Sequence, residues 1–193
     1  PETVALIRPI FGVVILLVGF LLARPGVLRI DAHGLLMLGL GGGAAVGVFQ
    51  VAYQMSIDAS GVPTTVALLY LSPALVAAAS GPLLGEWPTP RRLALIALTL
   101  VGVWLTVVGA EDVPAQFGGS GLAWGALAAA AYAAYTLFGR YATTRFGSAR
   151  TVVYSTAGAC AFLALAVPAA PGPFTLPSGA EAWLLLVAFG ALT

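Results

Sequence analysis

Residues 35–57 have the sequence LLMLGLGGGAAVGVFQVAYQMSI, a run of 23 residues without a charged side chain. A membrane-spanning helix needs roughly 20 apolar residues to cross about 30 Å of hydrocarbon. Backbone groups surrounded by lipid must be hydrogen-bonded within the segment, which an α-helix achieves. The run therefore predicts a membrane-spanning helix.

The same apolar character continues along the chain. Of its 193 residues, 60% are hydrophobic and 8% are charged, and the mean hydropathy is +1.01. A soluble domain carries about 25% charged residues, so the composition excludes a disordered chain, a nucleic-acid-binding protein and an ordinary cytosolic enzyme. We expect an all-α membrane protein, a polytopic helix bundle, with a seventh apolar block starting near Ala180. The six blocks long enough to span are Thr3–Ala23, Leu35–Ile57, Val62–Leu84, Leu93–Gly109, Gly121–Tyr141 and Thr151–Val167.

The two ends suggest an internal fragment of a longer membrane protein. The first residue is Pro1 rather than methionine, and the last apolar block stops after 14 residues. That is short of the roughly 20 residues that a span requires.

The arginines predict the orientation of the helices. Alternate connections carry seven of the eight, namely Arg24, Arg29, Arg91, Arg92, Arg140, Arg145 and Arg150. The other connections carry acidic residues only, namely Asp58, Glu111, Asp112 and Glu181. Basic loops stay on the cytoplasmic side, so we expect an integral protein of a bacterial-type cytoplasmic (inner) membrane with its arginine-rich loops in the cytoplasm.

An internal repeat appears at a shift of 148 residues, which aligns residues 3–4 with 151–152 and residues 32–45 with 180–193. The shift places the first predicted helix on the sixth and the second on the seventh, so each repeat has five helices. An odd number inverts the second copy, as in many secondary transporters. We therefore expect six full spans and a partial seventh of a ten-helix inverted repeat of two five-helix units.

Pro73 lies near the middle of the predicted span Val62–Leu84, with Tyr70 and Ser72 beside it. Proline removes a backbone hydrogen bond and kinks a helix. Two interpretations stay open, a packed kink and a hinge in a cavity wall. Beyond this helix, Gly85 suits a C-cap, and Glu86 can form a structural ion pair with a following arginine.

These features resemble the EamA-type transporters of the drug/metabolite transporter (DMT) superfamily. The matching parts are residues 3–8 (TVALIR), 70–74 (YLSPA), 83–86 (LLGE), the span 93–109 with Gly102, and 130–140, where the family usually has tryptophan at Tyr132. The resemblance implies ten helices and the export or exchange of small metabolites by alternating access. It assigns residues 1–110 to helices two to five of the first repeat and 111–120 to an external linker. Residues 121–193 become the first two helices and part of the third of the second repeat.

Several polar or aromatic side chains inside the predicted spans are candidates for lining a substrate cavity. Arg8 is the only charge well inside a span; it either extends to the outer surface or reaches the cavity, where it would suit a carboxylate-bearing metabolite such as an amino acid. The spacing of Trp124, Tyr132 and Tyr135 puts them on one helical face. The full candidate set is Arg8, Gln50, Tyr53, Gln54, Tyr70, Ser72, Pro73, Trp124, Tyr132 and Tyr135.

The glycines at 39, 41, 42, 43 and 47 predict a seam of close helix packing rather than a phosphate-binding loop. No catalytic set, metal site or cofactor motif is visible; the lone Cys160 suits an apolar filler. The expected partners are a small-molecule substrate and the lipid bilayer, and nothing in the sequence supports a homodimer. Three hypotheses remain: a secondary transporter, an intramembrane enzyme whose catalytic residues lie in missing segments, and a structural membrane subunit.

Overall fold

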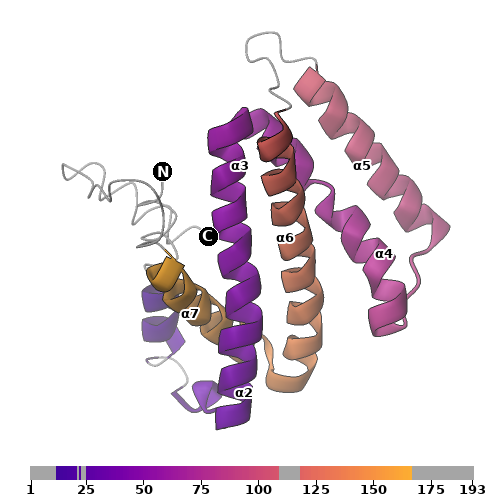
Figure 1. Cartoon of the computed structure of the whole chain (residues 1–193). Coiled ribbons are helices and arrows are strands. Elements are labelled where there is room, and N and C mark those ends of the chain that lie inside the picture. Colours follow the sequence, from indigo (N-terminus) through magenta and orange to yellow (C-terminus); the bar gives the residue numbers. More distant parts are fainter. Residues whose placement is uncertain (1–11, 21, 23–24, 109–117, 167–193) are drawn as a thin grey trace. The chain divides into compact units, whose positions relative to one another are not determined.

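A computed structural model describes residues 12–20, 22, 25–108 and 118–166 (Figure 1), and these residues contain helices and no strand. Residues 12–20 are helical. The elements that follow are η1 (Pro25–Leu28), α2 (Ala32–Leu36), the π-helical η2 (Met37–Gly42), α3 (Gly43–Leu69), α4 (Ser72–Leu84), α5 (Pro90–Val108), α6 (Gly119–Phe146) and α7 (Ser148–Ala166). The predicted all-α class is confirmed for this part of the chain. Two helical stretches, Ala32–Leu69 and Gly119–Phe146, are long and apolar enough to cross a membrane.

The chain divides into two compact units. The terminal unit contains the described residues up to Gly47 and from Phe138 onward, and the central unit contains Val48–Leu137.

The first long helical stretch begins three residues before the predicted start at Leu35. Asp31 is its N-cap, and the carboxylate accepts a hydrogen bond of 3.2 Å from the backbone N–H of Gly34. Aspartate is favoured there because it satisfies one of the orphan N–H groups of the first turn.

The predicted loop between the second and third spans is a sharp break within α3 instead. Gly61 has φ +77° and ψ 166°, while the residues on both sides remain helical. Glycine adopts positive φ at little cost because it has no Cβ, and Pro63 follows in the first turn after the break. The chain therefore reverses there without a separate loop.

The predicted kink at Pro73 is confirmed. The helix is interrupted at Tyr70 and Leu71, and α4 starts at Ser72 with the proline in its first turn. Before the break, the N–H of Leu71 donates to the carbonyl of Leu68 at 3.0 Å. This bond spans three residues and not the four of a regular α-helix, so the last turn is tighter. The proline lacks an N–H group and its ring clashes with the carbonyl four residues earlier, which accounts for the interruption in the turn before it.

The predicted C-cap at Gly85 is also confirmed. This glycine has φ +71°, and its N–H donates to the carbonyl of Gly81 at 2.9 Å. Ser80 closes the cap: its carbonyl accepts from the N–H of Glu86 at 3.2 Å, and its hydroxyl donates to the Glu86 carbonyl at 3.0 Å. The Gly-Glu pair thus ends α4 through its backbone.

Candidate functional site

The parts of α3 and α6 in the central unit pack antiparallel in a constant register. A Cβ on Gly121 would collide with the Ser60 side chain, and one on Gly125 would lie 3.0 Å from the Ser56 hydroxyl oxygen. Steps of four along α6 are thus matched by steps of four back along α3. Glycine at these positions lets the two helices approach closely.

An aromatic cluster of Phe49, Tyr53 and Tyr132 lies seven residues further along the same register. The Phe49 ring centroid is 5.1 Å from that of Tyr132 and 5.6 Å from that of Tyr53, with tilted planes. Such geometry is favourable for aromatic pairs. Phe49, which was not predicted, therefore joins two predicted residues, Tyr53 and Tyr132. Its position one helical turn before Tyr53 was the pattern in the sequence that could have indicated it.

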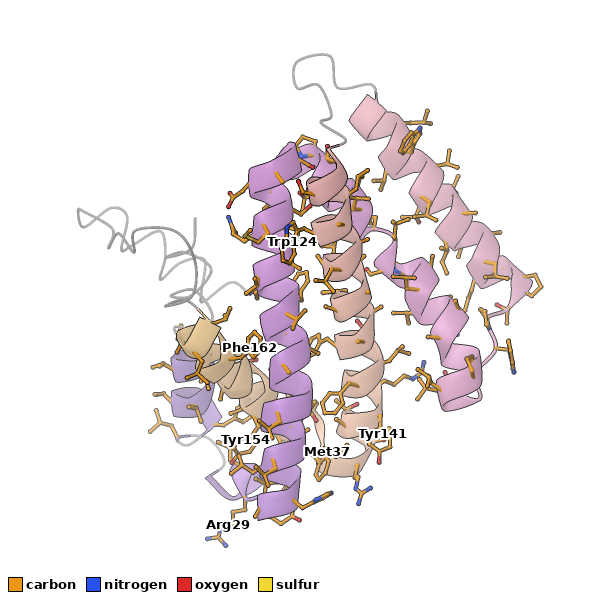
Figure 2. All side chains as sticks on the ribbon, viewed as in Figure 1. Arg29, Met37, Trp124, Tyr141, Tyr154 and Phe162 are labelled. Carbon is orange, nitrogen blue, oxygen red and sulfur yellow. The ribbon has the colours of Figure 1, made fainter. Side chains whose placement is uncertain are left out.

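Other predicted residues stand near this cluster in sequence, and no hydrogen bond or ring contact among the described residues joins them to it. Gln50 and Gln54 on α3, and Trp124 and Tyr135 on α6, are half-buried; Figure 2 labels Trp124. Tyr132 itself is 41% exposed, so its ring is accessible beside the helix contact.

The remaining candidates lie elsewhere. Tyr70 is exposed at the turn before α4, Ser72 is buried, and Pro73 is exposed. Gly102 lies in α5, where an added Cβ would meet no described atom within 4 Å. Arg8 lies outside the described residues.

A hydroxyl cluster that was not predicted surrounds the Gly61 break and consists of Ser56, Ser60, Thr64 and Thr65. All four side chains are buried. The Ser56 hydroxyl is 2.9 Å from that of Thr65 and donates to the Gly121 carbonyl at 3.1 Å, while Thr65 donates to the Gly61 carbonyl at 2.8 Å. Ser56 thus links both sides of the break to α6. The repeat of Ser56, Ser60 and Thr64 every four residues was the available signal.

Two members of this cluster have no hydrogen-bond partner among the described residues. The hydroxyl oxygens of Ser60 and Thr64 are buried and make no hydrogen bond within the described part of the chain. Burying an unpaired hydroxyl is unfavourable. The cluster therefore marks a polar position inside an otherwise apolar helix pair.

In the terminal unit, the predicted glycine seam is confirmed. Cβ atoms added to Gly42 and Gly47 would collide with Ser155 and Phe162 of α7, and one on Gly43 would lie 2.6 Å from the carbonyl carbon of Gly158. Residue numbers rise together on both sides of the contact, so the two helices run parallel.

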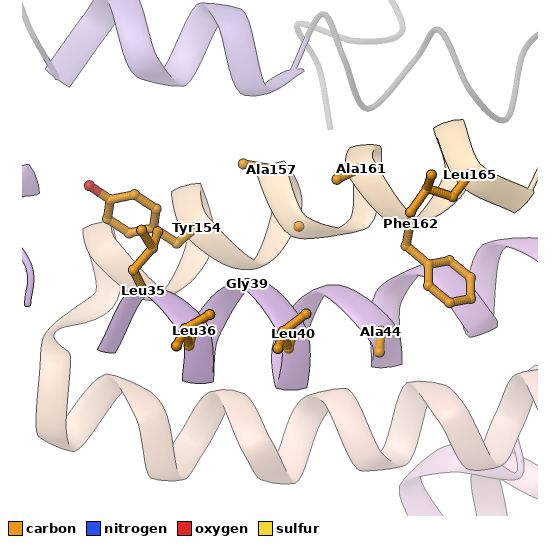
Figure 3. A pocket seen from close by; sticks show the side chains of 11 residues that line it. Leu35, Leu36, Gly39, Leu40, Ala44, Tyr154, Ala157, Ala161, Phe162 and Leu165 are labelled. Atoms are coloured by element: carbon orange, nitrogen blue, oxygen red, sulfur yellow. The ribbon is translucent and has the colours of Figure 1, made fainter. Parts of the chain in front are cut away.

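Beside this seam lies an apolar groove of about 340 Å³ between the α2–η2 stretch and α7 (Figure 3). It is lined by Leu35, Leu36, Gly39, Leu40, Ala44, Tyr154, Ala157, Gly158, Ala161, Phe162 and Leu165. None of the predicted cavity residues belongs to this groove. Its lining offers a lipid-like environment and almost no polar contact. Within the described residues, no group of three or more His, Cys, Asp or Glu side chains gathers to hold a metal ion.

These features define a helical membrane protein whose helices contact one another through small residues and break at glycine and proline. The sequence model of the EamA-like transporter family matches residues 1–108, and the chain belongs to this family. Its members are membrane transporters of the drug/metabolite transporter superfamily rather than enzymes. Comparison with curated proteins and with solved structures gives no match.

Proposed function

We propose that the chain is part of a secondary transporter that exports or exchanges small metabolites by alternating access. The break at Tyr70–Leu71 ahead of Pro73 carries the proposal. Non-helical backbone at membrane depth is tolerated only where protein or a wet cavity covers it, and transporters place their substrate sites at such discontinuous helices. We assign Tyr70, Ser72 and Pro73 to the cavity wall at this break.

The directions of the helices support an alternating arrangement of spans. The η2–α3 stretch and α7 run parallel in the terminal unit, whereas α3 and α6 run antiparallel in the central unit. Spans two and six of an alternating chain must be parallel, and spans two and five antiparallel. We therefore retain the ten-helix inverted repeat, with residues 1–110 in the first five-helix unit, 111–120 as an external linker and 121–193 in the second unit. The arginine-rich loops face the cytoplasm of a bacterial-type inner membrane.

The substrate class follows from the proposed lining. The aromatic cluster offers tyrosine hydroxyls and ring faces, and the amides of Gln50 and Gln54 stand on the same helix. Arg8 supplies a guanidinium for a carboxylate, and Trp124 and Tyr135 extend the aromatic face of α6. Amino acids and related polar metabolites match this set.

Solute flux tests the proposal. Full-length protein in proteoliposomes preloaded with a mixture of unlabelled amino acids should accumulate external radiolabelled amino acids by exchange. Arg8→Lys should reduce uptake less than Arg8→Gln, because it retains the positive charge but not the planar fork. Absence of exchange for all amino acids would contradict the substrate class. Wild-type uptake in both variants would show that Arg8 is not part of the substrate site.

A further inference from the structure

The apolar groove in the terminal unit is about as long as one membrane leaflet is thick. It extends along α7 from Tyr154 to Leu165, and the eleven steps between these residues, at 1.5 Å each, cover about 16 Å. Half of a hydrocarbon core of about 30 Å is about 15 Å. A transmembrane helix docked here would need a groove of about twice this length, whereas an acyl chain of one leaflet would not.

The groove is open along its side, as an acyl chain requires. Leu40 is 68% exposed and Leu165 is 81% exposed, so both edges are accessible. The floor is formed where Gly39 and Gly158 meet, because the carbonyl of the former lies where a Cβ of the latter would stand. Small residues on the walls, among them Ala44, Ala157 and Ala161, leave the space unfilled. The chemistry of this lining matches a hydrocarbon chain.

A positively charged side chain, that of Arg29, lies near one end of the groove. The Tyr154 hydroxyl, at that end, donates to the carbonyl of Leu28 at 2.7 Å, which anchors the segment leading into Arg29. Arg29 is exposed, and no described residue pairs with its guanidinium. The nearest acid in sequence, Asp31, uses a carboxylate oxygen to cap α2. Figure 2 shows Arg29 and Tyr154 toward the same end of the terminal unit.

We propose that this groove binds one acyl chain of an anionic phospholipid whose phosphate pairs with Arg29. The proposed orientation, in which Arg29 is cytoplasmic, assigns the lipid to the cytoplasmic leaflet. Binding itself does not depend on transport. The apolar groove supplies affinity for the chain, and the guanidinium supplies the preference for an anionic headgroup.

Native mass spectrometry of the full-length protein in detergent tests this inference. Phosphatidylglycerol and phosphatidylcholine with identical acyl chains are added at equal concentration. We expect about fivefold preference for phosphatidylglycerol, the effect of one arginine near an anionic surface. Arg29→Gln should abolish the preference, whereas Arg91→Gln, which removes an exposed arginine elsewhere, should retain it. Inorganic phosphate at the same concentration should not displace the lipid; displacement would mean that Arg29 binds a free anion only.

A variant in which the groove is filled distinguishes specific lipid binding from general contact with the bilayer. Ala161→Phe places a ring in the groove and should reduce bound phosphatidylglycerol severalfold. Ala164→Phe adds the same ring at an exposed α7 position outside the groove and should not. Equal binding in both variants would overturn the proposal.

Photo-cross-linking with a diazirine in the acyl chain gives a second measurement. Adducts should concentrate on η2 and α7; an even distribution that includes α5 would also overturn it. Amino-acid flux measured on the same samples reports the proposed function separately.

Discussion

Gly43 and Gly158 cross so closely that a Cβ added to the first would stand 2.6 Å from the carbonyl carbon of the second. Real Cβ atoms do not approach backbone to this distance, and backbone cannot yield as a flexible side chain can. The parallel contact between the η2–α3 stretch and α7 therefore depends on glycine at both positions. Close approach replaces the hydrophobic effect as the source of helix association in lipid.

Gly43→Ala should destabilise the protein, because the new methyl group must push the helices apart. We expect a loss of about 1–3 kcal/mol, typical of overpacking, seen as a lower melting temperature of the detergent-solubilised protein. Gly39→Ala is the matched control, since it lies one turn away and its Cβ would meet no described atom within 4 Å. Equal melting temperatures for the two variants would contradict the observed crossing.

Ser56 and Thr65 should be energetically coupled across the Gly61 break. Ser56→Ala removes the hydroxyl contact with Thr65 and the bond to the Gly121 carbonyl. Interhelical hydrogen bonds in membranes contribute about 0.6 kcal/mol on average, so the single variants should each cost about 0.5–2 kcal/mol.

A double-mutant cycle with Thr65→Val should give a non-additive term near that average. Thr99→Ala serves as the control, because this exposed hydroxyl donates to the Leu95 carbonyl of its own helix and bonds to no other helix in the described part of the chain. Strict additivity would show that the two hydroxyls act independently.

Pro73→Ala should impair transport more than folding. The substitution supplies an N–H group and removes the ring that interrupts the helix at Tyr70–Leu71, so the bend should relax. Expression and membrane insertion should persist while flux in proteoliposomes falls. Pro82→Ala, in the last turn of the same helix, should leave flux unchanged. Unaltered flux in a well-inserted Pro73→Ala variant would make the bend a packing feature only.

Tyr132→Phe should distinguish the contribution of the hydroxyl to transport from the contribution of the ring to packing. The phenyl ring retains the contact with Phe49, whose centroid lies 5.1 Å away, so the melting temperature should change little. Amino-acid exchange should fall because a polar group of the proposed cavity is lost. Tyr132→Ala should lower both the melting temperature and amino-acid exchange. A Tyr132→Phe variant with full exchange activity would exclude the hydroxyl from substrate binding.

The side of each loop can be tested by cysteine accessibility in a Cys160→Ala background. We expect Arg91→Cys and Arg145→Cys to react with a membrane-impermeant maleimide only after the membrane is opened, and Glu111→Cys to react in intact cells. Labelling of Arg91→Cys and Glu111→Cys from the same side would refute the proposed topology.

Local chemistry made several features predictable. The interruption before Pro73 was predictable, because the ring and the missing N–H of a proline disturb the helix within one turn. Gly85 caps a helix for a similarly local reason, and the glycines from 39 to 47 predict close packing because small side chains cannot fill space. The Gly61 break was placed correctly as a discontinuity but was expected to be a loop, since a single glycine with positive φ can reverse the chain without one.

The sequence alone determined that the chain is helical, belongs in a membrane and breaks at given residues, because hydropathy and backbone restrictions act over a few neighbouring positions. Only the tertiary structure decided which residues meet across helices. Phe49 joins Tyr53 to Tyr132, Ser56 bridges the break to Gly121, and the groove opens beside Gly158. Those pairings depend on the register and direction of helices far apart in sequence, and in a chain so rich in interchangeable apolar residues no local pattern specifies them.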